Sequence, residues 1–115
     1  MSPREPDPVD RSEALRNLRT RAELGELRVT QHAHQEMVAE GISLQDVLEA
    51  VSVGEILENY PRYRRGPCCL LYGTTASGRD LHVVCTTVQP MLVIITVYQP
   101  RPPKWPTPTQ RTGGT

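Results

Sequence analysis

The pattern of apolar and polar positions changes once along the chain, near Gly54. Before this point, apolar residues recur at intervals of three and four, most clearly between Leu44 and Val51, which is typical of amphipathic helices. After it, short runs rich in branched residues are separated by turn residues such as glycine and proline, which predicts strands. We therefore expect helices in the first half of the chain and a sheet in the second.

Residues that start and stop helices divide the first half further. Asp10, Thr30 and Ser43 are the expected N-caps, and the first and last are followed three residues later by an acidic residue that can complete a capping box. Gly25 and Gly41 are expected to end helices, because glycine readily takes the left-handed conformation at this position. The expected elements are a helix over about 10–24, a strand over 27–30, a helix over 31–40 and a helix that begins after Ser43.

The second half predicts four strands. The last of them is nearly all apolar and rich in branched residues, which suits a strand inside the sheet that is covered on both faces. Helices followed by strands predict an α+β domain, here an antiparallel sheet of four to five strands with the N-terminal helices packed on one face. The expected strands cover residues 55–60, 68–73, 81–88 and 91–98.

Both ends of the chain are rich in proline and poor in residues that a core could bury. We expect residues 1–9 to be disordered, residues 10–100 to form a single domain, and residues 101–115 to form a Pro-rich tail that is mostly disordered. Trp105 is the exception in this tail. As the one tryptophan of a chain without phenylalanine, it is expected to dock on its own domain or on a partner.

Length and composition restrict the class of protein. The 115 residues suffice for one domain, and no apolar run approaches the roughly 20 residues that a membrane-spanning helix needs. The N-terminus lacks the apolar stretch of a secretory signal. Three cysteines without a CxxC pair argue against a disulfide framework or a four-cysteine zinc site, and buried, unreactive thiols are expected instead. These features predict a cytoplasmic protein that does not bind membranes.

The formal net charge of zero conceals an uneven distribution. Residues 36–60 contain six acidic residues and no basic one, whereas residues 61–115 contain seven basic residues and one acidic residue. The basic half indicates a surface that faces a polyanion, or a partner with the opposite arrangement of charge. The loop over residues 60–67 fits RNA best, because its arginines can bind phosphate and its tyrosines can stack on bases. The alternative is an ordinary solvated hairpin loop.

The three histidines are the candidate proton carriers. His32 and His34 are two residues apart on a helix, so their side chains point in roughly opposite directions and could share a metal ion only if the segment is extended there. The HExxH spacing of zinc enzymes is also absent, and we expect no metal or other cofactor. The helix dipole favours a neutral imidazole near a helix start, although a structural histidine bonded to backbone is the alternative. Whether His82 and Tyr98 share a face of the sheet depends on the turn between their strands.

Several segments together resemble the bacterial family named domain of unknown function 4258. The resemblance extends over roughly residues 27–105, and no single segment is diagnostic of it. The chain has Glu36 and Glu40 where many members have arginine, and it has a basic rather than an acidic sequence before Trp105. The resembling segments are Thr30–His34, Glu36–Met37, Gly41–Ser43, Asp46–Val47, Tyr60–Pro61, Cys69–Gly73, Gly78–Arg79, Leu81–Val84, Thr96–Pro100 and Trp105.

The resemblance implies a function. Members of this family resemble small toxins of the RelE and barnase-like ribonuclease group, and many are encoded beside a small zinc-finger antitoxin. This implies a metal-independent endoribonuclease of a bacterial toxin–antitoxin pair, with RNA as its substrate and such an antitoxin as its partner. A base would take the proton of a ribose 2′-hydroxyl, and an acid would protonate the leaving oxygen. The residues implied are His32 and His82 as base and acid in either order, Tyr98 to orient, His34 to assist, and Arg62, Arg64, Arg65 and Arg79 to bind phosphate.

Two other functions remain open from the sequence. The first is a non-catalytic module that binds a protein through the acidic helices or through the tail around Trp105. The second is a small protein that binds a metal or ligand through His32, His34, His82 or Cys85.

Overall fold

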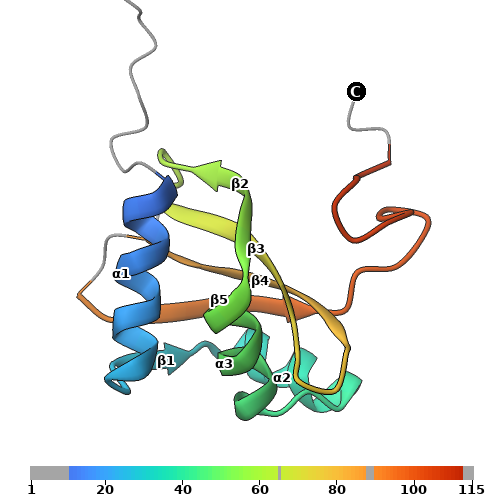
Figure 1. The fold of residues 1–115 in the computed structure, drawn as a ribbon, viewed down its shortest axis with the longest axis horizontal. Helices are drawn as coiled ribbons and strands as arrows, with labels where there is room; N and C mark the ends of the chain where they lie inside the picture. Colours follow the sequence, from blue (N-terminus) through green and yellow to red (C-terminus); the bar gives the residue numbers. More distant parts are fainter. Residues whose placement is uncertain (1–10, 65, 88–89, 113–115) are drawn as a thin grey trace, which may run out of the picture.

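The computed structural model describes residues 11–64, 66–87 and 90–112. The expected disordered residues 1–9, the expected cap Asp10, Arg65 of the basic loop, Val88 and Gln89, and residues 113–115 lie outside the described residues. Within the described parts, three helices and five strands form an α+β fold, as the sequence predicts (Figure 1). Their bounds are α1 Arg11–Glu23, β1 Leu27–Val29, α2 Gln31–Glu40, α3 Leu44–Val53, β2 Glu55–Tyr60, β3 Cys68–Thr74, β4 Asp80–Thr86 and β5 Leu92–Tyr98.

The caps predicted for α2 and α3 are present and explain where these helices begin and end. The hydroxyl of Thr30 accepts a hydrogen bond of 3.0 Å from the backbone N–H of Ala33. Ser43 and Asp46 form both bonds of a capping box, each 3.0 Å long. Gly41 ends α2 with a φ of +66°, a left-handed conformation that glycine adopts without steric cost.

The five strands form one sheet in the order β1-β5-β4-β3-β2. Strands β2 to β5 pair antiparallel with their neighbours, as expected, but β1 pairs parallel with β5 through Leu27–Val29 and Leu92–Ile94. The prediction of a purely antiparallel sheet is therefore wrong, and the sheet is mixed. A parallel pair needs a long crossover connection, which the two helices and three strands between β1 and β5 supply here. Nothing in a three-residue strand reveals such a distant partner.

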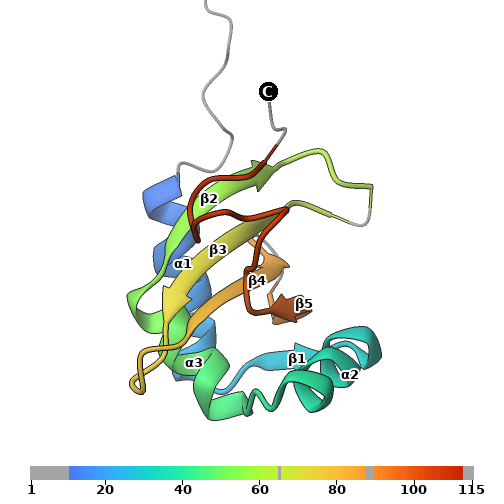
Figure 2. The ribbon, with the colours of Figure 1, turned by 90° about the vertical axis from the view of Figure 1, so that its right-hand side faces the viewer.

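Buried residues of all three helices join one hydrophobic cluster with alternate residues of the strands. Residues two apart in a strand point to the same face, so Leu81, Val83 and Cys85 of β4 enter this cluster while His82 between them does not. Figure 2 shows α1 behind the strands and the C-terminal segment in front of them. The helical members of the cluster are Ala14, Leu18, Ala33, Met37, Val47, Ala50 and Val51.

Acidic side chains of α2 satisfy the backbone of β5 beyond the point where β1 ends. The pairing with β1 stops at Ile94. Farther along, a carboxylate oxygen of Glu36 accepts from the N–H of Val97 in β5 at 2.9 Å, and one of Glu40 accepts from the N–H of Gln99, the residue after β5, at 3.1 Å. Buried backbone donors need such partners. The acidic character of this helix therefore has a structural cause.

We expect Gly73→Ala to destabilise the fold strongly. A Cβ atom at this position would lie 2.0 Å from the carbonyl oxygen of Ala50 in α3, so the helix would have to move away from β3. Overpacking of this kind costs about 1–3 kcal/mol or more of the free energy of unfolding, which urea denaturation measures. Gly78→Ala is the control, because a Cβ there meets no atom within 4 Å and the change strains only the backbone. An equal or smaller loss in Gly73→Ala than in Gly78→Ala would contradict the close approach.

Candidate functional site

His82 lies at the centre of the sheet, on the face opposite the helix-packed cluster. In the register of the strands, it stands directly across from Tyr72 of β3 and from Tyr98 of β5. His82 and Tyr98 therefore share a face, which the sequence left open. The side chain of His82 is fully buried. A polar ring in this position needs hydrogen-bond partners for both of its nitrogens.

Both nitrogens of His82 have partners. Nε2 lies 2.7 Å from the carbonyl oxygen of Pro108, and Nδ1 lies 3.1 Å from the hydroxyl of Tyr98. Because a carbonyl can only accept, Nε2 carries the hydrogen, and Nδ1 accepts from the Tyr98 hydroxyl. Aromatic rings enclose the imidazole in edge-on contacts, with centroids 4.3 Å away for Trp105, 5.2 Å for Tyr98 and 6.1 Å for Tyr72. We call His82, Tyr72, Tyr98 and Trp105 the outer-face cluster.

Pro108 and Trp105 belong to residues 101–112, which fold back over the sheet on the side away from α1 (Figures 1 and 2). We call these residues the strap. The sequence predicts that the tail is mostly disordered but that Trp105 docks. In the structure Trp105 docks on its own domain, with 3% of its surface exposed. The position of the strap follows from this one large apolar ring, which covers His82.

An ion pair at the edge of the outer-face cluster joins the strap to β2. Arg111 donates two hydrogen bonds to the carboxylate of Glu58, at 3.1 and 2.8 Å, and Tyr60 donates a third. The guanidinium carbon of Arg111 also lies 4.9 Å from the centre of the Trp105 ring, in a cation–π contact. A continuous series of contacts thus leads from β2 to β4, through Glu58, Arg111, Trp105 and His82.

Burial and these partners shift the pKa values of the two proton carriers in the series. Burial of the imidazole lowers the pKa of His82 below its ordinary value. Burial alone would raise the pKa of Glu58, but the hydrogen bonds from Arg111 and Tyr60 outweigh it and lower that pKa. At neutral pH the site therefore holds an ionised carboxylate and a neutral imidazole.

The other predicted histidines lie elsewhere. His32 and His34 stand on the exposed side of α2, and Nε2 of His32 lies 3.3 Å from a carboxylate oxygen of Glu36. In the part of the chain that the structure describes, no hydrogen bond, ring contact or ion pair joins either histidine to His82. The structure thus brings together His82 and Tyr98 of the predicted proton-transfer residues.

The predicted phosphate-binding arginines also divide. Arg62 and Arg64 are exposed in the loop between β2 and β3, where they can reach a ligand. The guanidinium of Arg79 instead binds the carbonyl oxygens of Glu40 and Gly41 at 2.9 and 2.8 Å, and the side chain of Gln99 at 3.2 Å. These bonds hold the C-terminal end of α2, where the helix dipole favours a cation. Arg79 therefore has a structural role in this conformation.

The three cysteines are buried and unpaired, as the sequence indicated. Cys69 and Cys85 face each other across β3 and β4 within the helix-packed cluster, and Cys68 points to the opposite face. Burial raises the pKa of Cys68 to about 11, so this thiol is protonated at neutral pH. Among the described residues, no group of three or more histidine, cysteine or acidic side chains is arranged to hold a metal ion.

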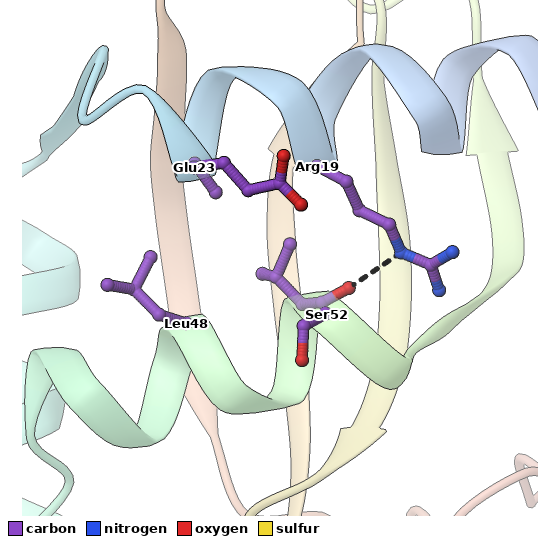
Figure 3. A pocket seen from close by; sticks show the side chains of 6 residues that line it. Arg19, Glu23, Leu48 and Ser52 are labelled. Atoms are coloured by element: carbon purple, nitrogen blue, oxygen red, sulfur yellow. Dashed lines mark hydrogen bonds between the residues drawn. The ribbon is translucent and has the colours of Figure 1, made fainter.

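Two pockets lined by described residues lie apart from the outer-face cluster. One, of about 210 Å³, lies between α1 and α3 (Figure 3). Arg19 closes one side of it and donates to the carbonyl oxygen of Val51 at 3.2 Å. The other lies between α1 and the start of β2. Neither pocket is lined by a residue that the sequence marked for chemistry.

No described helix has the length and apolar character needed to cross a bilayer.

Sequence reasoning missed two charged residues of this site. Glu58 alternates with Tyr60 in β2, and this spacing of two was the available signal that they share a face. Arg111 had no such signal, because it follows four prolines in a segment expected to be disordered. Only the docking of Trp105 brings Arg111 to Glu58.

We expect the stability of the protein to fall as the pH drops below about 6.5, and His82→Gln to flatten this part of the pH dependence. The pKa of His82 is lower in the folded chain than its ordinary value of 6.5, so the unfolded chain binds more protons in this range. The contribution is fully present above the unfolded pKa and is lost as the pH falls through the folded pKa. Urea denaturation between about pH 7.5 and pH 5.5 measures it. Parallel curves for the two proteins would show that His82 is not the group responsible.

Comparison with known proteins identifies one related family. A family model with the description "Domain of unknown function (DUF4258)" matches residues 29–99. No curated protein matches the chain. No solved structure matches it. The matched residues run from the end of β1 to the residue after β5, so they contain His82, Tyr98 and Glu58 but not the strap.

Proposed function

The chain belongs to the family described as domain of unknown function DUF4258, and from its geometry we propose that it is a metal-independent endoribonuclease whose site is the outer face of the sheet. The observation that carries the proposal is the pair of proton carriers on that face. His82 is oriented by Tyr98, and Glu58 lies two strands away, on the far side of β3. Adjacent strands are about 4.8 Å apart, and Glu58 is level with Leu70 and Val84, two residues along β4 from His82, so roughly 12 Å separates the two backbones at these residues. Side chains that extend toward each other across this distance can contact a ribose and its adjacent phosphate.

The two groups suit the two proton transfers of RNA cleavage. The ionised carboxylate of Glu58 accepts the proton of a ribose 2′-hydroxyl, and the 2′-oxygen forms a bond to the adjacent phosphorus. The bond from phosphorus to the 5′-oxygen breaks, and His82 donates a proton to that oxygen through Nε2. This step uses the protonated imidazole, which burial makes the minor form of His82 at neutral pH. The products are a 2′,3′-cyclic phosphate and a free 5′-hydroxyl. The hydroxyl of Tyr98 can accept from or donate to Nδ1, and therefore orients His82 in both protonation states.

The surroundings of the site favour a polyanionic substrate. Arg62 and Arg64 extend from the loop that joins β2 to β3, beside the strand that carries Glu58. Tyr63 in the same loop is 46% exposed and offers a ring for base stacking. Compared with the sequence-based hypothesis, Glu58 replaces His32 as the second proton carrier. His34 and Arg79 have no part in this form of the proposal.

Cleavage of a single-stranded RNA oligonucleotide tests the proposal. We expect His82→Gln and Glu58→Gln each to lower the cleavage rate about 100-fold or more, because general acid–base catalysis contributes about 10²–10⁴-fold. His32→Gln is the matched control and should leave the rate unchanged. The product should carry a 2′,3′-cyclic phosphate, and DNA of the same sequence should stay intact because it lacks the 2′-hydroxyl. Circular dichroism establishes that each variant is folded.

Equal cleavage by the folded parent, His82→Gln and Glu58→Gln proteins would refute the assignment. Expression gives a second readout, since a toxin of this kind should arrest bacterial growth and the two variants should relieve the arrest. Persistent arrest by both variants would also contradict the proposed site.

A non-catalytic binding module is the second candidate, because His82 is fully buried with both nitrogens bonded. In that case the outer-face cluster only anchors the strap, and the chain acts by binding a protein partner through the acidic helices or through the tail around Trp105. The same assay separates the two functions. A binding module leaves the RNA uncut and co-purifies with a stoichiometric partner.

A further inference from the structure

We propose that the strap, residues 101–112, is an intramolecular cover that occupies the substrate position between Glu58 and His82 and must move before RNA can bind. This inference rests on the proposed function, since it concerns access to the same site. It adds a form of regulation that neither the family description nor the two proton carriers imply.

The contacts of the strap are those that a bound nucleotide would make. The Trp105 ring lies edge-on against His82, 4.3 Å away, where a base or ribose would lie. Arg111 binds the carboxylate of Glu58 and thereby occupies the group that would accept the 2′-hydroxyl proton. The carbonyl of Pro108 takes the Nε2 hydrogen of His82, the position from which the leaving oxygen would be protonated. Each proton carrier is thus blocked by a different residue of the strap.

The strap is also built so that it can leave as a unit. Its backbone hydrogen bonds within the described residues all join one strap residue to another, namely Trp105 to Arg101, Gln110 to Thr107 and Thr112 to Lys104. No backbone bond of this set ties it to β3, β4 or β5, so its release breaks no strand pairing. The sheet keeps its own ladders when the strap moves.

The bonds that hold the strap are few. The Glu58–Arg111 pair keeps about a third of each side chain exposed, and an ion pair this exposed contributes little to stability and weakens with salt. The indole nitrogen of Trp105 is buried without a hydrogen-bond partner in the described part of the chain. Such a group opposes docking. A polyanion adds a further force for opening, because it competes with Glu58 for Arg111 and with Glu40 for Arg101, the second ion pair between the strap and the rest of the chain.

Chemical modification of the histidines in the full-length chain tests the cover. Diethyl pyrocarbonate reacts with accessible imidazoles, and mass spectrometry of the digested protein reports each histidine separately. In the parent protein, we expect His82 to react at least 10-fold more slowly than the exposed His32 and His34. Arg111→Ala and Trp105→Ala should bring His82 to within about twofold of them. Lys104→Ala removes an exposed strap cation whose side chain forms no hydrogen bond or ion pair with any described residue, and should leave His82 protected.

Cleavage of the RNA oligonucleotide by the same proteins separates the two proposals. Faster modification of His82 together with faster cleavage in Arg111→Ala and Trp105→Ala supports both. Faster modification without any cleavage supports the cover and refutes the ribonuclease. Cleavage by the parent protein that neither variant accelerates, with His82 equally slow to react in all folded proteins, supports the ribonuclease and overturns the cover.

Hydrogen exchange of the unaltered chain gives a test that does not depend on the folding of any variant. The amides of Trp105, Gln110 and Thr112 should exchange at least 10-fold faster than the paired amides of β3, β4 and β5, because the strap opens without unfolding the sheet. Exchange of these amides at the rate of the sheet, through global unfolding alone, would overturn the proposal.

Discussion

The burial of a neutral imidazole at the centre of the sheet is the constraint on which the outer face depends. A buried polar ring is tolerated only when its nitrogens are hydrogen-bonded. For His82 one partner, Tyr98, comes from the neighbouring strand, and the other, the carbonyl of Pro108, comes from the strap. The tautomer of His82, its lowered pKa and the position of the C-terminal segment are therefore one coupled arrangement, and movement of the strap changes all three.

Charged residues have two different roles in this fold. Glu36, Glu40 and Arg79 complete the backbone hydrogen bonding where α2 meets the end of β5, and this group stabilises the edge of the sheet. Glu58 and Arg111 meet on the outer face, where neither completes a backbone bond. For this reason the proposed chemistry is assigned to the outer face. It is not assigned to α2, where the exposed His32 lies beside Glu36.

Local patterns in the sequence predicted the elements closely. The bounds of α2 and β2 agree with the expected ones at both ends, and the capping box of Ser43 and Asp46 is present, because caps and periodicity act over a few residues. The prediction that every strand pairs antiparallel was wrong for β1, because its partner β5 lies 65 residues away along the chain. Pairing at such a distance depends on how the intervening elements pack, which no short pattern records.

Sequence alone determined that this chain is an α+β domain of the DUF4258 family, with a lone histidine in a strand and a single tryptophan in a Pro-rich tail. The tertiary structure decided which of these residues meet. The register between β4 and β5, which contains an irregularity near Val84, placed Tyr98 against His82 rather than on the opposite face. The docking of Trp105 then carried Arg111 to Glu58. Both outcomes depend on contacts between distant segments, whose free energies come from the whole packed fold rather than from neighbouring residues.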